Sequence, residues 1–121
     1  MANEQPSEAM VLNSSELERL NDYDSRLFGF LNLEADENTG VKNLLDKAVQ
    51  YYDQQLKTPE KHNLDLSVLC RLGHFHLLLG DYTKALSAYQ KFFTLQPDYW
   101  KDATFLYGLA MVYFHFSAYQ W

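Results

Sequence analysis

Cysteine is scarce in this chain, and basic residues are outnumbered by acidic ones. Cys70 is the one cysteine among 121 residues. A single cysteine excludes an intramolecular disulfide and a thiolate metal cluster, and it suits a reducing compartment. Ten Lys and Arg stand against 16 Asp and Glu, and nine of these acids lie in residues 1–40. Without a basic excess we expect no direct binding to DNA or RNA, because that affinity comes mostly from Lys and Arg.

A long apolar run is also missing. The most apolar stretch, residues 105–116, has twelve residues and includes Gly108 and His115. A membrane-spanning helix needs about 20 apolar residues, so no membrane insertion is expected. The first ten residues, MANEQPSEAM, are acidic and polar, whereas a secretory signal begins with positive charge and continues with an apolar run. Secretion is therefore not expected either.

The first half of the chain shows helical spacing of apolar residues after a polar start. Residues 1–22 are acidic, and we expect them to be largely flexible. Ser15 and Glu18 fit a capping box, and the leucines that follow predict a first helix ending near Leu33. After the turn composition DENTG, apolar residues recur every three or four positions and predict a second helix, which Pro59 ends.

The second half predicts a tight helical hairpin that begins again further on. In residues 65–97, Gly80 can end one helix in the left-handed conformation, and the carboxylate of Asp81 can cap the next. Gly108 lies 35 residues after Gly73 (108 minus 73) in a similar setting. A helix-turn-helix unit repeated with a period in the thirties is typical of a solenoid.

This hairpin resembles the tetratricopeptide repeat. The pattern of that repeat is matched by Leu72, Gly73, Ala85, Tyr89 and Pro97. The small residues allow two helices to approach closely, the tyrosine packs against the next repeat, and the proline fixes the turn. We therefore expect the repeat-packing residues to be Leu72, Gly73, Ala85, Tyr89, Pro97 and Gly108.

The resemblance implies an all-α fold, in which helical hairpins form the start of a right-handed solenoid. The expected organisation is a flexible segment over residues 1–22 and a repeat region over residues 23–121. Within this region we expect a degenerate repeat at about 23–59, a clear repeat at about 66–99 and an incomplete repeat at about 101–121. The chain stops at Trp121 where a covering helix should begin, so we expect a truncated array.

Several stretches resemble the UTX family of histone H3 lysine-27 demethylases more closely than the general repeat. They are residues 24–30 (DSRLFGF), 72–75 (LGHF), 81–82 (DY), 84–90 (KALSAYQ), 98–101 (DYWK), 105–109 (FLYGL), 112–115 (VYFH) and 120–121 (QW). They include residues that the repeat pattern leaves free, namely His74, Phe75, Trp100 and His115. Differences at loop positions suggest a distant, non-mammalian member, present here as a fragment or short isoform.

The resemblance implies a nuclear chromatin regulator. The family works in transcription regulation within a COMPASS-like complex that contains MLL3/MLL4-type methyltransferases, so subunits of that complex are the implied partners. Its iron- and 2-oxoglutarate-dependent chemistry belongs to a distal domain, and this chain is expected to hold no cofactor. An independent tetratricopeptide-repeat adaptor unrelated to chromatin is the alternative.

The groove of the solenoid is where the repeat pattern predicts partner contacts. The first helices of successive repeats line the concave face. In this register the candidate groove residues are Cys70, His74, Leu77, Asp102, Phe105, Leu109 and Val112. The hypothesis is that this mixed, partly apolar surface holds an apolar segment of a partner or of the same protein.

Catalytic and metal-binding patterns are missing from the sequence. No histidine is followed two positions later by an acid, and no serine has a triad spacing. Cys70, His74 and His76 form the one cluster that suggests a metal, but His76 points to another face of a helix and a fourth ligand is lacking. The aromatic residues of 105–121 have helical spacing and are interpreted as core. The chain is therefore expected to carry no catalytic site.

Overall fold

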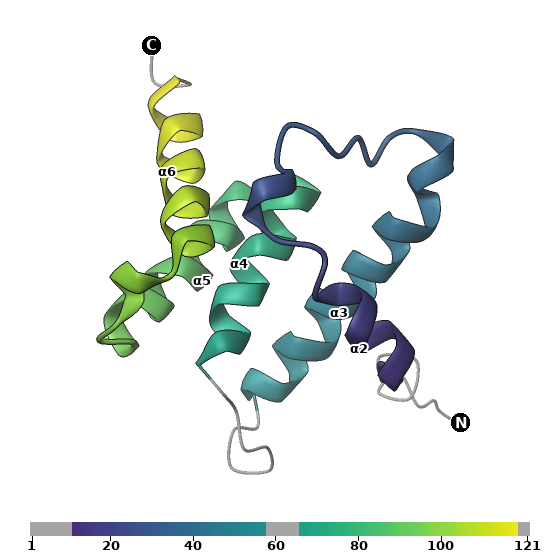
Figure 1. Ribbon diagram of the computed structural model, residues 1–121, viewed down its shortest axis with the longest axis horizontal. Coiled ribbons are helices and arrows are strands. Elements are labelled where there is room, and N and C mark those ends of the chain that lie inside the picture. The colour runs from purple at the N-terminus through teal and green to yellow at the C-terminus, as the bar shows by residue number, and fades with distance from the viewer. Residues whose placement is uncertain (1–10, 58–65, 119–121) are drawn as a thin grey trace.

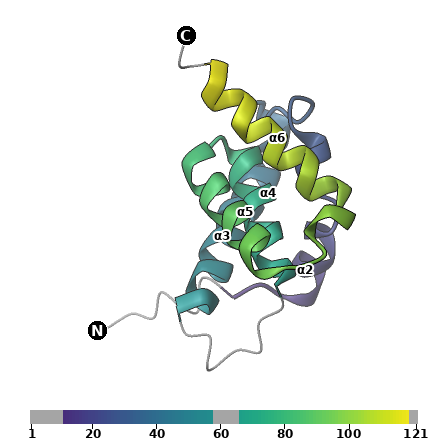
Figure 2. The same ribbon diagram turned by 90° about the vertical axis from the view of Figure 1, so that its left-hand side faces the viewer.

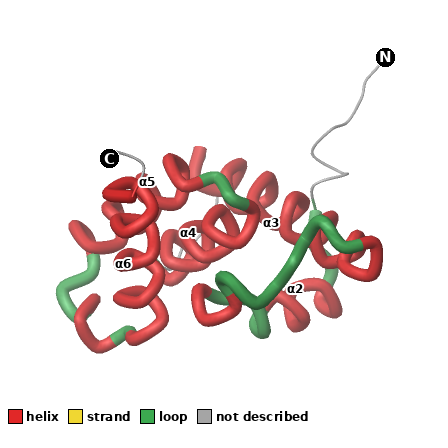
Figure 3. Tube along the Cα trace, turned by 90° about the horizontal axis from the view of Figure 1, so that it is seen from above, coloured by secondary structure: helices red, strands yellow, loops and turns green. Residues whose placement is uncertain are grey.

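The computed structural model describes residues 11–57 and 66–118 and shows only helices and turns within them (Figure 1). The elements are α2 (Ser14–Leu20), η1 (Ser25–Leu27), η2 (Asp36–Asn38), α3 (Thr39–Lys57), α4 (Ser67–Leu79), α5 (Tyr82–Leu95), η4 (Tyr99–Lys101) and α6 (Ala103–Ala118). Viewed from above, the helices lie in a row that runs from α2 and α3 through α4 to α5 and α6 (Figure 3). The predicted all-α fold class is confirmed.

Helices α4 and α5 form an antiparallel hairpin with a tight turn. Gly80 adopts φ +85°, which is the left-handed region that favours glycine, and its N–H bonds the carbonyl of Leu77 at 3.1 Å. The next residue, Asp81, donates its N–H to the carbonyl of His76 at 2.9 Å. The Asp81 carboxylate then accepts from the amide of Lys84 at 3.3 Å and caps α5. The turn chemistry predicted from these two residues is thus present.

Helix α3 packs against α4, and residues of both helices form the first of two core clusters. Its buried residues Leu45 and Ala48 are fully covered, and Tyr52 stacks on Phe75 of α4 with ring centroids 6.4 Å apart. Helix α2 closes this core from outside through Leu20. This first core cluster is lined by Leu12, Leu20, Leu44, Leu45, Ala48, Tyr52, Val68, Leu72, Phe75 and Ala88.

Helix α6 packs against both α4 and α5, as Figure 2 shows from the side. The second core cluster lies between these helices and contains Leu69, Cys70, Leu77, Ala85, Tyr89, Phe92, Phe105 and Val112. Phe105 is in contact with two aromatic rings of α5, at centroid distances of 5.6 Å to Tyr89 and 4.8 Å to Phe92. The two clusters share helix α4, which is why that helix is buried along most of its length.

The prediction of a first helix ending near Leu33 is wrong. Helix α2 begins two residues earlier than expected, with Asn13 and not Ser15 as its cap, in a capping box with Glu16, and it ends at Leu20. A 3-10 turn follows, because the Asp24 side chain accepts from the Arg26 amide and caps a new start. Gly29 then adopts φ +89°, which cannot continue a right-handed helix.

Two parts of the predicted organisation depend on these N-terminal residues. The segment expected to be flexible, residues 1–22, contains helix α2 in its described part, whereas residues 1–10 lie outside the described residues. The degenerate repeat expected at about 23–59 has one long helix, α3, and short turns where its first helix was expected. The stop at Pro59 also lies outside the described residues, and α3 extends to Lys57.

Candidate functional site: the groove between α4 and α6

Two glycines allow a tyrosine to lie between α4 and α6. The Tyr89 side chain of α5 is 0% exposed and lies against both Gly73 and Gly108. A Cβ atom added to Gly73 would lie 2.9 Å from Tyr89 Cζ, and one added to Gly108 would lie 2.7 Å from the same atom. Carbon atoms do not approach this closely without contact repulsion, so any larger residue at either position would displace the ring. The spacing of 35 residues therefore places two glycines around one aromatic ring.

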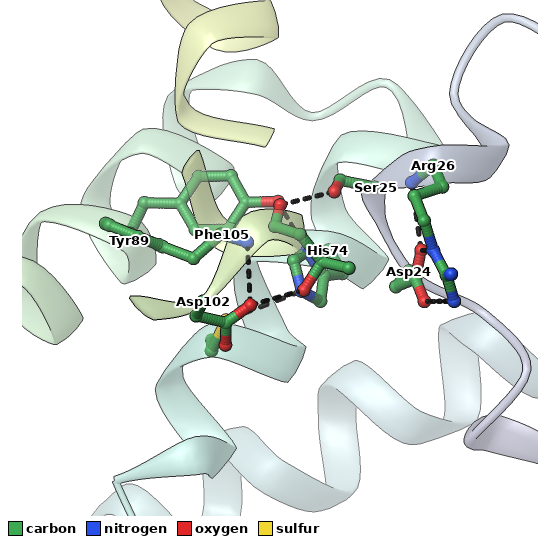
Figure 4. Close-up of polar contacts among 9 residues, drawn as sticks. Asp24, Ser25, Arg26, His74, Tyr89, Asp102 and Phe105 are labelled. Carbon is green, nitrogen blue, oxygen red and sulfur yellow. Dashed lines mark hydrogen bonds and ion pairs between the residues drawn. The ribbon is translucent and has the colours of Figure 1, made fainter. Parts of the chain in front are cut away.

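A chain of hydrogen bonds runs beneath the groove from α5 to the start of α6 (Figure 4). Tyr89 Oη lies 2.7 Å from His74 Nδ1, and His74 Nε2 lies 3.4 Å from Cys70 Sγ. The Cys70 thiol in turn donates to Asp102 Oδ2 at 3.7 Å. A neutral His74 with its proton on Nε2 satisfies all these contacts, since it donates to Cys70 and accepts from Tyr89.

Burial keeps this chain of groups uncharged except at Asp102. Burial lowers the pKa of His74 to about 4, although the carboxylates of Asp24 and Asp102 oppose that shift. It also raises the pKa of the Cys70 thiol and of the Tyr89 phenol above their ordinary values. Burial alone would raise the pKa of Asp102, but hydrogen bonds from the Thr104 hydroxyl, the Phe105 amide and the Cys70 thiol lower it. A thiol held in this state is a poor nucleophile.

Residues 24–28, which we call the crossing segment, cover this chain of groups from the N-terminal side. Its turn η1 contacts both α4 and α6. Ser25 is 0% exposed and donates its hydroxyl to the carbonyl of Thr104 in α6. At the other end of the segment, the Phe28 ring meets Tyr82 edge-on at 6.1 Å.

The structure brings the candidate groove residues together, but it buries most of them. Five of them are buried, namely Cys70, His74, Leu77, Phe105 and Val112, while Asp102 and Leu109 are partly buried. Partner contact at these residues stays a prediction. Charge reversal at such positions would perturb packing as much as binding, because buried charge without a partner is destabilising.

The residues expected to pack repeats together also have defined places. Leu72, Gly73, Ala85, Tyr89 and Gly108 are buried, whereas Pro97 is exposed in the turn after α5. Helix α6, in addition, carries large apolar side chains that no described residue covers fully: Leu106 is 41% exposed, Tyr113 49% and Phe114 69%. An exposed apolar stripe of this kind is typical of a surface that meets another protein or helix.

Two further kinds of feature are relevant to the described residues: a metal site and a membrane-spanning helix. Within 11–57 and 66–118, no three His, Cys, Asp or Glu side chains lie where they could hold a metal ion. In the same ranges, no helix combines the length and apolar character that crossing a bilayer requires.

The structural class is a helical hairpin that packs against further helices on both sides. Residues 66–99 match the family model of the tetratricopeptide repeat, which spans α4, α5 and the turn after them. The prediction of tetratricopeptide-type helical hairpins is thereby confirmed, and such repeats are modules of protein-protein interaction scaffolds. No solved structure matches the chain.

Proposed function

We propose that this chain is the N-terminal repeat region of a UTX-like histone H3 lysine-27 demethylase. In this role it is a protein-binding scaffold for chromatin and transcription regulation in the nucleus, within a COMPASS-like complex. Its partners are subunits of an MLL3/MLL4-type methyltransferase complex. In this role, iron and 2-oxoglutarate belong to a distal domain of such a protein.

The resemblance to the UTX family at positions that the repeat pattern leaves free supports this proposal. Three of the four such residues are explained by packing around the hairpin. His74 bonds Tyr89, Phe75 is 0% exposed, and the His115 ring stacks on Tyr82 at 3.5 Å. The general repeat pattern does not require these three residues. They reflect how this particular hairpin packs against its neighbours.

The exposure of the fourth residue, Trp100, is the main support for the proposed binding role. This residue lies in η4 between α5 and α6, is 60% exposed, and has the Lys101 ammonium 5.2 Å from its ring centroid. Packing does not account for a large aromatic side chain in this position. Exposed tryptophan is among the residues that most often contribute binding energy at protein interfaces. We therefore place the partner contact around Trp100.

Affinity capture from nuclear extract tests the proposal. The immobilised chain should retain subunits of the MLL3/MLL4-type methyltransferase complex, and Trp100→Ala should reduce that retention about tenfold or more. Leu95→Ala is the matched control, because Leu95 is a 56% exposed apolar residue outside the stretches that resemble the family. Both variants should keep their stability within about 0.5 kcal/mol.

Two results would argue against the proposal. Equal retention by Trp100→Ala and by the unaltered chain would remove Trp100 from the interface. Retention of other proteins without any methyltransferase subunit would instead favour an independent repeat adaptor unrelated to chromatin.

A further inference from the structure

The crossing segment fits the groove through a residue with a small side chain. Ser25 approaches α6 where Gly108 lacks a side chain, and a Cβ atom at position 108 would lie 3.0 Å from Ser25 Cβ. The Ser25 hydroxyl bonds the Thr104 carbonyl, which lies one helical turn before Gly108. Position 25 thus selects a small residue by shape and a hydroxyl donor by hydrogen bonding.

Internal bonds give the crossing segment its shape. The Asp24 carboxylate accepts from the Arg26 amide at 2.9 Å and pairs with the Arg26 guanidinium at 2.7 Å. The amides of Leu27 and Phe28 bond the carbonyls of Asp24 and Ser25 at 3.1 and 3.0 Å. These backbone groups remain paired whether the segment lies in the groove or outside it. Release therefore leaves none of these five backbone groups without a partner.

The crossing segment does not fill the groove. A cavity of about 200 Å³ remains beside Asp24, and its lining includes Arg71, His74 and Asp102. Arg71 is already oriented by a hydrogen bond to the side chain of Asn21. The site is thus larger than the segment that occupies it.

The aromatic residue at the end of the segment, Phe28, has its own packing site. Phe28 is partly buried and packs against the second core cluster, where its ring meets the edge of Tyr82. Three features therefore describe the segment as a ligand: an acid at position 24 that caps its turn, and two residues that contact the groove, a small hydroxyl residue at 25 and an aromatic ring at 28.

We propose that the groove between α4 and α6 is a peptide site that residues 24–28 occupy in cis, and that a partner displaces them. The partner that fits is a protein segment with an acidic residue, a serine directly after it and an aromatic residue three positions later. This inference rests on the proposed scaffold function and adds which chemistry the groove selects. It also implies that partner binding at the groove competes with the chain's own N-terminal half.

A labelled peptide with the sequence of residues 22–31 tests the proposal on the full chain. In the unaltered chain the groove is occupied and the peptide should bind weakly. Ser25→Glu places a larger, charged side chain at a fully buried position and should release the segment, so that the peptide binds about tenfold more tightly or better. Ser87→Glu, the same change at an exposed serine of α5, should leave the affinity of the unaltered chain unchanged. A peptide with glutamate at the serine position should bind none of them.

A milder variant decides the question if Ser25→Glu does not fold. Ser25→Ala keeps the small side chain and removes only the hydrogen bond to Thr104, so peptide affinity should rise by about threefold or more. A folded Ser25→Glu chain, or a Ser25→Ala chain, that binds the peptide no better than the unaltered chain would overturn the proposal. So would a dimer in which two copies exchange their crossing segments, because the groove would then serve a second copy. The probe is a peptide of this chain, so a negative peptide result does not affect the capture experiment with Trp100→Ala. A negative capture experiment likewise does not change the peptide result.

Discussion

Replacing Gly73 or Gly108 with alanine should destabilise the chain, although alanine is the better helix former. Both glycines lie inside helices, where alanine gains about 1 kcal/mol over glycine. Both also face the Tyr89 ring, which is fully buried and cannot move aside. Overpacking of a well-filled core costs about 1–3 kcal/mol, and the close contacts here favour the upper part of that range. We expect each variant to lose about 1–2 kcal/mol of unfolding free energy.

The two sites should respond differently to Tyr89→Phe. The nearest atom to a Cβ at position 108 is Tyr89 Oη, whereas a Cβ at position 73 meets the ring atoms Cδ1 and Cε1. Removing the hydroxyl relieves part of the first clash and none of the second. In a double-mutant cycle, Tyr89→Phe should therefore show a favourable coupling of about 0.5–1 kcal/mol with Gly108→Ala and a coupling near zero with Gly73→Ala.

Urea unfolding followed by circular dichroism measures these values. Gly40→Ala is the control, because Gly40 lies in helix α3 and an added Cβ there meets nothing within 4 Å. That variant should be neutral or stabilised by up to about 1 kcal/mol. If Gly73→Ala and Gly108→Ala gained stability as Gly40→Ala does, the close approach of Tyr89 to both helices would be refuted.

Three further predictions concern acid, thiol reagents and association. Between pH 6.5 and about 4 the histidine at position 74 binds a proton in the unfolded chain but not in the folded one. The unfolding free energy should therefore decrease as the pH is lowered, by up to about 3 kcal/mol. His74→Gln should flatten this pH profile. His76, whose pKa burial also lowers, acts in the same direction, and a profile that rose toward acid would contradict both assignments. The Cys70 thiol is buried with a raised pKa, so a thiol reagent should label the native chain about a hundredfold more slowly than the urea-unfolded chain, and equal rates would contradict the burial. Phe114→Lys removes a 69% exposed aromatic residue and should reduce self-association in sedimentation experiments. The melting temperature should fall by no more than a few degrees. Unchanged association would exclude this part of α6 as a contact between copies of the chain.

The hairpin of α4 and α5 was predictable because its signals are local. Gly80 and Asp81 satisfy the turn with bonds to residues at most five positions away, so their identity is enough to predict the conformation. The role of Gly73 and Gly108 followed from their spacing, since two glycines one repeat apart meet the same kind of neighbour.

The cover of the groove was not predictable from the sequence. Ser25 and Thr104 are 79 positions apart, and nothing in either stretch indicates that they meet. The apolar residues after position 26 have helical spacing, which suggested a helix, but the cap at Asp24 and the positive φ of Gly29 override that spacing. His74 and Phe105, which were expected on an open concave face, are both buried, Phe105 against the rings of Tyr89, Phe92 and Tyr99.

Photo-crosslinking from position 100 in nuclei would test the proposed scaffold role most directly. A crosslinking amino acid in place of Trp100 should form covalent adducts with a subunit of the MLL3/MLL4-type methyltransferase complex. The same amino acid in place of Gln90, an exposed residue of α5, should form none. Adducts from both positions alike, or adducts from position 100 only with proteins outside that complex, would contradict the proposed function.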